Sequence, residues 1–188
     1  MSSGALFLLP IASALVVTIA RFVELGTRRN VIPGRVRETL TLRLFMVIGL
    51  LVLAFSIAEY VLSGRGISWP FFVAGWIVAL LSFWLRRRAI AALGRFWSLH
   101  VEIRDEHELV TGGPFRYVRH PAYLSMILEL TALALLCNAR FSLLFALLAF
   151  PPVMLMRIHL EEHALVEKFG SAYSTYQNAT PALIPRPW

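Results

Sequence analysis

The chain has 188 residues, of which 58% are hydrophobic and 15% charged, and its mean hydropathy is +0.69. A soluble domain of this size carries about 25% charged residues, so this composition excludes an ordinary soluble domain and indicates an integral membrane protein. The net charge of +7 comes from 18 basic residues, 17 of them arginines, against 11 acidic ones. We expect no nucleic-acid partner, because the arginines gather at the ends of apolar runs instead of covering one soluble face.

Five apolar runs follow one another along the chain, at 5–20, 44–62, 67–85, 123–138 and 141–156. The second and third have the length of about 20 residues that a helix needs to cross a bilayer, and the other three must borrow flanking residues. Only Ala139 and Arg140 separate the last two runs, so these form a tight helical hairpin. The sequence therefore predicts an all-α integral membrane protein with five transmembrane helices.

The basic residues predict how these helices are oriented. Connections 21–43 and 86–119 hold six and seven Lys or Arg residues, the tail from 157 onward holds three, and the other two connections hold one each. The positive-inside rule places the basic side in the cytoplasm. We predict a multi-pass protein with its N-terminus outside, and with its C-terminus and both long polar segments in the cytoplasm.

The first polar segment, 97–123, ends at the start of the fourth apolar run. An alternating stretch in it suggests a short extended piece, and Gly-Gly-Pro at 112–114 predicts a turn. His120 is biased away from helix by the next residue, Pro121, which suits the first position of a helix. His120 would then lie at a helix N-terminus, which favours a bound carboxylate or phosphate. Anchoring at headgroup depth explains the same stretch equally well, through Arg116, Tyr117, Arg119 and Tyr123.

The second polar segment, 157–185, continues the fifth apolar run as a helix that should stop at Gly170. Glu161 and Glu162 lie near the membrane boundary, one turn after Arg157, and an Arg157–Glu161 pair on a solvated face would explain their spacing. The pentapeptide HLEEH at 159–163 fits the zinc pattern H-x-x-E-H at only three positions and lacks a good third protein ligand. We expect no metal.

Glu129 stands apart, because it lies inside the fourth apolar run. A carboxylate within a membrane helix is costly, so it is a candidate functional residue. Pairing with an arginine is the other explanation for it.

Two stretches carry a family resemblance: LVTGGPFRYVRHPAYL at 109–124 and RIHLEEHALVEKFGSAYSTY at 157–176. They contain L-V-T-x-G-x-Y/F, R-H-P-x-Y, R-x-x-x-E-E and F-G-x-x-Y-x-x-Y in order, and they resemble the isoprenylcysteine carboxyl methyltransferase family of integral membrane methyltransferases. The resemblance implies one transmembrane methyltransferase domain over 1–188. Residues 1–96 would hold the first three transmembrane helices and 97–188 the catalytic half, where a cytoplasmic loop and a C-terminal helical extension form the cofactor site.

The resemblance also implies S-adenosylmethionine as the methyl donor and assigns residues by position. Arg157 matches the substrate-contacting arginine of the family. Apart from the resemblance, Glu162 is a candidate catalytic base, and Glu129 is a second-rank substrate-binding candidate because of its place inside an apolar run. Phe115 replaces a tyrosine of the family pattern, so the hydrogen bond of that hydroxyl is lost. The implied cofactor contacts are His100, His107, Glu108, Leu109, Val110, Phe115, His120, Pro121, Ala122, Tyr123 and Glu161.

We predict an enzyme that methylates a lipophilic small-molecule or prenylated acceptor reached from the lipid bilayer. The acceptor atom is left open between an isoprenylcysteine-like carboxylate, which Arg157 would hold, and a lipid-like enol or phenol, which needs a base such as Glu162 or His159. The stretch QNAT at 177–180 replaces basic residues of the eukaryotic enzymes and favours a small lipid-like acceptor.

Three alternatives remain at this stage. One is a phospholipid N-methyltransferase, which would have no use for Arg157 at the reaction centre. Another is an NADPH-dependent sterol-type reductase, which would need Arg116 and Arg119 for the cofactor's 2′-phosphate. The third is a membrane scaffold that only binds lipid headgroups.

Overall fold

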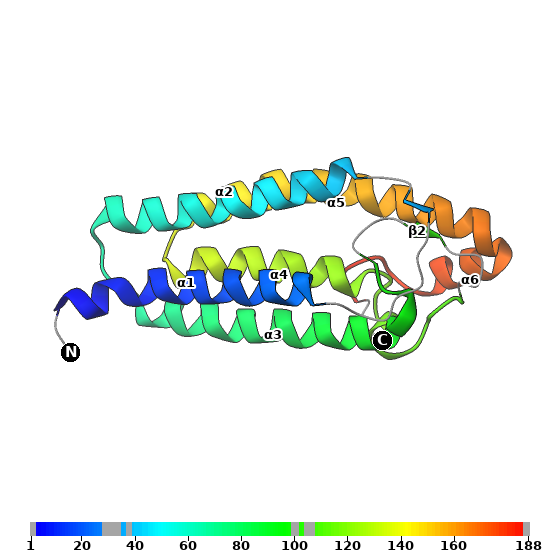
Figure 1. Ribbon diagram of the computed structural model, residues 1–188, viewed down its shortest axis with the longest axis horizontal. Coiled ribbons are helices and arrows are strands. Elements are labelled where there is room, and N and C mark those ends of the chain that lie inside the picture. Colours follow the sequence, from blue (N-terminus) through cyan, green and yellow to red (C-terminus); the bar gives the residue numbers. More distant parts are fainter. Residues whose placement is uncertain (1–2, 28–34, 37–38, 99–101, 104–107, 186–188) are drawn as a thin grey trace. The chain divides into compact units, whose positions relative to one another are not determined.

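The computed structural model describes residues 3–27, 35–36, 39–98, 102–103 and 108–185, which are mostly helical (Figure 1). The described residues also contain two short 3-10 helices, η1 (Gly94–Phe96) and η2 (Gly113–Arg116). They contain two short antiparallel strands as well, β1 (Arg35–Val36) and β2 (Glu102–Ile103). The predicted all-α membrane fold is confirmed. The α-helices are α1 (Ser3–Gly26), α2 (Leu40–Ser63), α3 (Trp69–Leu93), α4 (Pro121–Leu136), α5 (Arg140–Phe169) and α6 (Ser171–Ala179).

The long helices follow the apolar runs. α1, α2, α3 and α5 have 24, 24, 25 and 30 residues, which makes them about 36–45 Å long, enough for a hydrocarbon core of about 30 Å. α4 has 16 residues and is about 24 Å long. Among the described residues, four helices are therefore long and apolar enough to cross a membrane. The count of five transmembrane helices stays a prediction.

The chain divides into two compact units. The first unit consists of 1–28, 46–82 and 126–150, and the second of 29–45, 83–125 and 151–188. Each unit takes segments from both 1–96 and 97–188, so the units do not follow the boundary expected between the transmembrane and catalytic halves. The single-domain organisation stays a prediction.

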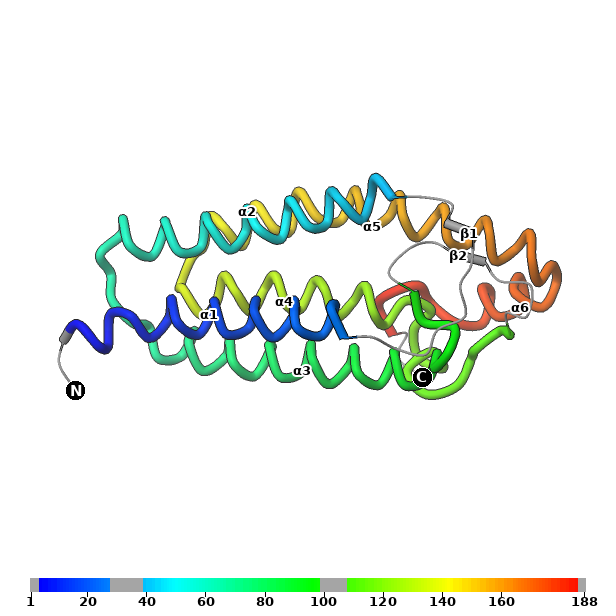
Figure 2. Tube along the Cα trace, in the orientation of Figure 1, coloured from blue at the N-terminus to red at the C-terminus, as the bar shows by residue number. Residues whose placement is uncertain are grey.

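In the first unit, α4 and α5 form the expected hairpin. Only residues 137–139 join the two helices (Figure 2), and Asn138 has a φ of +49°, which asparagine tolerates better than most residues. The carboxylate of Glu59 caps α5: it accepts hydrogen bonds from the backbone N–H of Phe141 at 3.2 Å and of Ser142 at 2.9 Å. A side chain of α2 thereby satisfies donors that the first turn of α5 would otherwise leave without an acceptor.

The first unit also contains a buried ion pair between Arg21 of α1 and Glu129 of α4. Arg21 donates to Glu24 on its own helix as well. Glu129 therefore has an arginine partner, the simpler of its two explanations, and its role in substrate binding stays a prediction.

In the second unit, the start of α4, the polar end of α5 and α6 surround one cluster of side chains. α5 runs through Pro151 and Pro152 and ends at Phe169, where Gly170 turns the chain with a φ of +55°. After α6 the chain passes beside the start of α4, because the backbone N–H groups of Arg119 and His120 donate to the carbonyls of Pro181 and Ala182 at 2.9 and 3.0 Å. The beginning of α4 and the segment directly after α6 are thus held together.

Candidate active site

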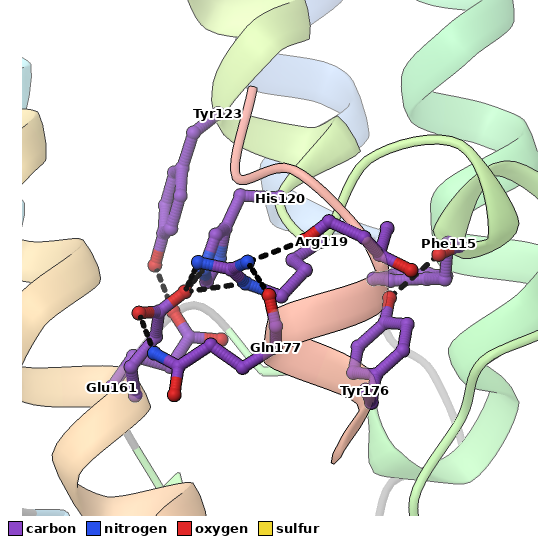
Figure 3. A network of polar contacts seen from close by, with 9 residues as sticks. Phe115, Arg119, His120, Tyr123, Glu161, Tyr176 and Gln177 are labelled. Carbon is purple, nitrogen blue, oxygen red and sulfur yellow. Dashed lines mark hydrogen bonds and ion pairs between the residues drawn. The ribbon is translucent and has the colours of Figure 1, made fainter. Parts of the chain in front are cut away.

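Glu162 of α5 is the most heavily bonded carboxylate of the cluster, and Figure 3 labels its partners Arg119, His120 and Gln177. Its Oε1 atom accepts from Nε and Nη2 of Arg119, both at 2.8 Å, and lies 2.9 Å from Nε2 of His120. Its Oε2 atom accepts from Nε2 of Gln177 in α6 at 2.7 Å. Both oxygens are therefore engaged, and Glu162 ties α6 and the start of α4 to α5.

Arg119 makes its hydrogen bonds to other groups of the protein. Besides Glu162, its Nη1 atom donates to the backbone carbonyl of Gln177 at 2.8 Å and to that of Thr180. The side chain is only 11% exposed. This geometry suits neither a headgroup anchor nor a ligand for a cofactor phosphate. Arg116, by contrast, is an exposed side chain.

Tyr123 is hydrogen-bonded to both Glu161 and Arg157. Its hydroxyl donates to Oε2 of Glu161 at 2.5 Å and accepts from Nε of Arg157 at 3.0 Å. The ring of His120 stacks against the ring of Tyr123, with centroids 5.5 Å apart. A carboxylate, a phenol and a guanidinium from α4 and α5 are therefore linked in one chain of hydrogen bonds.

Arg157 is buried, with 3% of its surface exposed. Its Nη1 atom donates to the hydroxyl of Thr41 at 2.9 Å, and its guanidinium lies 5.6 Å from the ring centroid of Phe45. Both partners belong to the first turns of α2. Two of the contacts that hold Arg157 thus come from residues that lie more than 100 positions earlier in the sequence.

Two phenols of α6 lie beside this cluster. Burial raises the pKa of Tyr176 to about 12, against the lowering effect of Arg119, and its hydroxyl donates to the carbonyl of Phe115 at 2.6 Å. Burial, together with the negative charge of Glu162, raises the pKa of Tyr173 well above its usual value. Both phenols are neutral at pH 7, so the negative charge of the cluster resides on its carboxylates.

The structure brings together five of the predicted site residues, namely His120, Tyr123, Arg157, Glu161 and Glu162. The others lie in different settings. Phe115 and Pro121 are buried, Ala122, Leu109 and Val110 are half-buried, and Glu108 is exposed and lies 4.0 Å from Arg95. His100 and His107 lie outside the described residues, and Glu129 belongs to the first unit.

Sequence reasoning did not single out Thr41, Phe45 or Gln177. Tyr176 was within reach, because it is the last tyrosine of the F-G-x-x-Y-x-x-Y motif, whereas Thr41 and Phe45 stand in no motif. No group of three or more metal-ligating side chains occurs in the part of the chain that the structure describes.

Comparison with known proteins decides the family. The pattern of the Isoprenylcysteine carboxyl methyltransferase (ICMT) family matches residues 75–167. Protein-S-isoprenylcysteine O-methyltransferase B of Arabidopsis thaliana is 30% identical over 143 residues, in an alignment that covers 72% of this chain and 72% of that protein. The chain belongs to the ICMT family.

Two further relatives are similar to shorter parts of the chain. Protein-S-isoprenylcysteine O-methyltransferase of Schizosaccharomyces pombe is 36% identical to this ICMT-family chain over 105 residues, 54% of the chain and 44% of the yeast protein. The cobalt-zinc-cadmium resistance protein CzcN of Cupriavidus metallidurans is 34% identical over 104 residues, 52% of the chain and 45% of that protein.

Family membership confirms the resemblance seen in the motifs and identifies the chain as an integral membrane methyltransferase. It also supports methyl transfer to a lipophilic acceptor over the phospholipid N-methyltransferase and reductase alternatives, and it implies S-adenosylmethionine in general terms. The matched residues 75–167 include Arg119, Tyr123, Arg157 and the two glutamates of the cluster, whereas α6 and the start of α2 lie outside them.

Proposed function

We propose that this ICMT-family chain transfers a methyl group from S-adenosylmethionine to the carboxylate of an isoprenylcysteine-like acceptor, at the cluster around Tyr123. One observation carries the proposal: a single phenol is bonded to Glu161 at 2.5 Å and to Arg157 at 3.0 Å. The family resemblance gives Glu161 to the cofactor and Arg157 to the acceptor, so the two reactants would be held on either side of Tyr123. The names of the Arabidopsis and yeast relatives support the acceptor class.

The side chains present fit this cofactor. Tyr123 donates to Oε2 of Glu161, and among the described residues no donor bonds to Oε1 of that half-buried carboxylate. Such an oxygen suits the ribose hydroxyls or the amino group of the cofactor. The first backbone N–H groups of α4, at Ala122 and Tyr123, have no acceptor within the helix and suit its carboxylate. When bound, S-adenosylmethionine supplies an electrophilic methyl group on a positively charged sulfur.

Arg157 would hold the acceptor carboxylate in line for transfer, through charge-assisted hydrogen bonds from a planar guanidinium. Such an acceptor is already ionised at neutral pH and needs no general base. Glu162, offered as a base for an enol or phenol, has both oxygens engaged by Arg119, His120 and Gln177. We therefore propose that Glu162 positions its partners, and this favours a carboxylate as the acceptor group.

The acceptor is proposed to be a small lipophilic acid in preference to a prenylated protein. The chain has QNAT at 177–180. The side chain of Gln177 donates a hydrogen bond to Glu162, and its backbone carbonyl accepts one from Arg119. This stretch therefore closes the cluster internally. A prenylated protein of the same C-terminal chemistry should be the poorer acceptor.

The test uses the purified full-length chain in detergent with methyl-labelled S-adenosylmethionine and N-acetyl-S-farnesylcysteine. We expect an alkali-labile methyl ester, and Arg157→Ala should lower kcat/KM by about 10- to 100-fold, since a hydrogen bond to a charged group contributes about 1.5–3 kcal/mol. The control is Arg116→Ala, which removes an exposed arginine of the same segment. Equal activity of the two variants, or an alkali-stable product on phosphatidylethanolamine, would overturn the proposal.

We also propose the orientation that the arginines indicate, with the N-terminus outside and the C-terminus and the cluster in the cytoplasm. It rests on 16 of 18 basic residues falling on one side of a five-span arrangement. A fluorescent protein fused after Trp188 should fluoresce in a bacterial host, and a periplasmic alkaline phosphatase fused there should stay inactive. The reverse pair of results would contradict the orientation.

A further inference from the structure

Two residues of α2, Thr41 and Phe45, contact the guanidinium of Arg157. Thr41 is fully buried, and its hydroxyl accepts a hydrogen bond from Nη1 of Arg157 at 2.9 Å. Phe45, one helical turn further on, places its ring centroid 5.6 Å from the same guanidinium. Both residues lie outside the stretch 75–167 that matches the family.

Holding a carboxylate with two parallel hydrogen bonds requires the plane of the guanidinium to be fixed. The arginine side chain has several rotatable bonds, so a single contact leaves that plane free to turn. Here Nε is bonded to Tyr123 of α4 and Nη1 to Thr41 of α2, while an aromatic ring lies near the group. Two contacts from two helices fix a plane, which one contact cannot do.

We propose that Thr41 is a positioning residue for methyl transfer, which orients the guanidinium of Arg157 toward the acceptor carboxylate, with Phe45 supporting it. This inference rests on the proposed function, because it takes Arg157 as the acceptor-binding group. Thr41 itself touches neither reactant. Its proposed effect on catalysis passes through Arg157.

The hydrogen bonds run from Thr41 through Arg157 and Tyr123 to Glu161. Thr41 lies at the acceptor end of this chain and Glu161 at the cofactor end. Removing the Thr41 hydroxyl should therefore weaken the use of the acceptor and leave the cofactor in place. Removing the Tyr123 hydroxyl, which lies between the ends, should impair both.

The experiment compares Thr41→Val, which keeps the shape and removes the hydroxyl, with Thr41→Ser, which keeps the hydroxyl. In Thr41→Val we expect kcat/KM for N-acetyl-S-farnesylcysteine to fall about 10-fold, as for the loss of one hydrogen bond to a charged group. The Kd for S-adenosylhomocysteine, measured by calorimetry, should stay within about twofold. Thr41→Ser should restore most of the acceptor kinetics.

The matched control is Ser56→Ala, because Ser56 is another buried hydroxyl of α2 and has no hydrogen-bond partner among the described residues. It should leave acceptor kinetics unchanged. Wild-type kinetics in Thr41→Val, equal impairment in Thr41→Ser, or a parallel loss of S-adenosylhomocysteine binding would each overturn the positioning role.

Acceptor binding separates this inference from the proposed function. If the wild-type chain binds N-acetyl-S-farnesylcysteine without methylating it, and Thr41→Val weakens that binding about 10-fold, the proposed reaction fails and the positioning of Arg157 stands. If the wild-type chain does not bind this acid at all, both fail.

Discussion

Replacing Arg119 by methionine should strongly destabilise the second unit. The substitution keeps an apolar stem of similar length and removes the donors to Glu162, Gln177 and Thr180. The Arg119 and Glu162 side chains are only 11% and 13% exposed. Removing one partner of a buried ion pair costs about 3–5 kcal/mol, because the remaining charge is left without its partner. We take about 3 kcal/mol, since His120 and Gln177 still contact Glu162.

Thermal unfolding in detergent, followed by tryptophan fluorescence, measures the effect. A loss of about 3 kcal/mol corresponds to a Tm lower by about 6–12 °C for a chain of this length. Arg116→Met, at an exposed arginine, should change Tm by less than about 2 °C. In a double-mutant cycle, Glu162→Gln should cost less in Arg119→Met than in the wild-type chain, because the charge that it removes is already without its partner.

Two results would refute this reasoning. A Tm of Arg119→Met within about 2 °C of wild type would mean that the contacts to Glu162 contribute little to folding. Strict additivity of Arg119→Met and Glu162→Gln would mean that the two side chains do not interact in solution. Either result would also return Arg119 to the residues available for a ligand.

Three further predictions concern stability. Gly75→Ala should lower Tm, because a Cβ atom there would lie 2.8 Å from the backbone nitrogen of Leu136 and overpacking costs about 1–3 kcal/mol. The control is Gly49→Ala, where an added Cβ atom meets no other atom within 4 Å, and its Tm should be unchanged or higher. Glu59→Gln should lower Tm by weakening the cap of α5, and an unchanged Tm would contradict that role. Because the pKa of Tyr176 is raised to about 12 in the folded chain, its contribution to stability is complete below about pH 10 and is lost as the pH rises toward 12. The Tm of Tyr176→Phe should therefore fall less than that of the wild-type chain between pH 9 and pH 11, and equal losses would contradict the assignment.

The helices were predictable because they depend on local sequence. The apolar runs located α1 to α5, Pro121 marked the start of α4, and Gly170 marked the end of α5. Backbone groups in a membrane must be satisfied within their own segment, so a long apolar stretch has few conformations other than a helix. The motifs likewise named Tyr123 and Glu161 without a structure, since their order along the chain was enough.

The roles of neighbouring residues were not predictable in this way. Glu161 and Glu162 are adjacent in sequence, yet one bonds to Tyr123 and the other to Arg119, His120 and Gln177. Successive side chains point about 100° apart on a helix, so adjacent glutamates face different neighbours. The motif R-x-x-x-E-E contains both glutamates and does not indicate which partner each of them contacts.

By itself, the sequence determined the membrane class of this protein, the positions of its helices and the family to which it belongs. Only the tertiary structure decided that Arg119 donates to a carbonyl of α6 and that both oxygens of Glu162 accept hydrogen bonds. It also decided that Thr41, 116 residues before Arg157, is hydrogen-bonded to the guanidinium of that arginine. The physical reason is that helix formation depends on residues a few positions apart. The choice of a hydrogen-bond partner depends instead on which helices pack side by side, and no local pattern of residues records that choice.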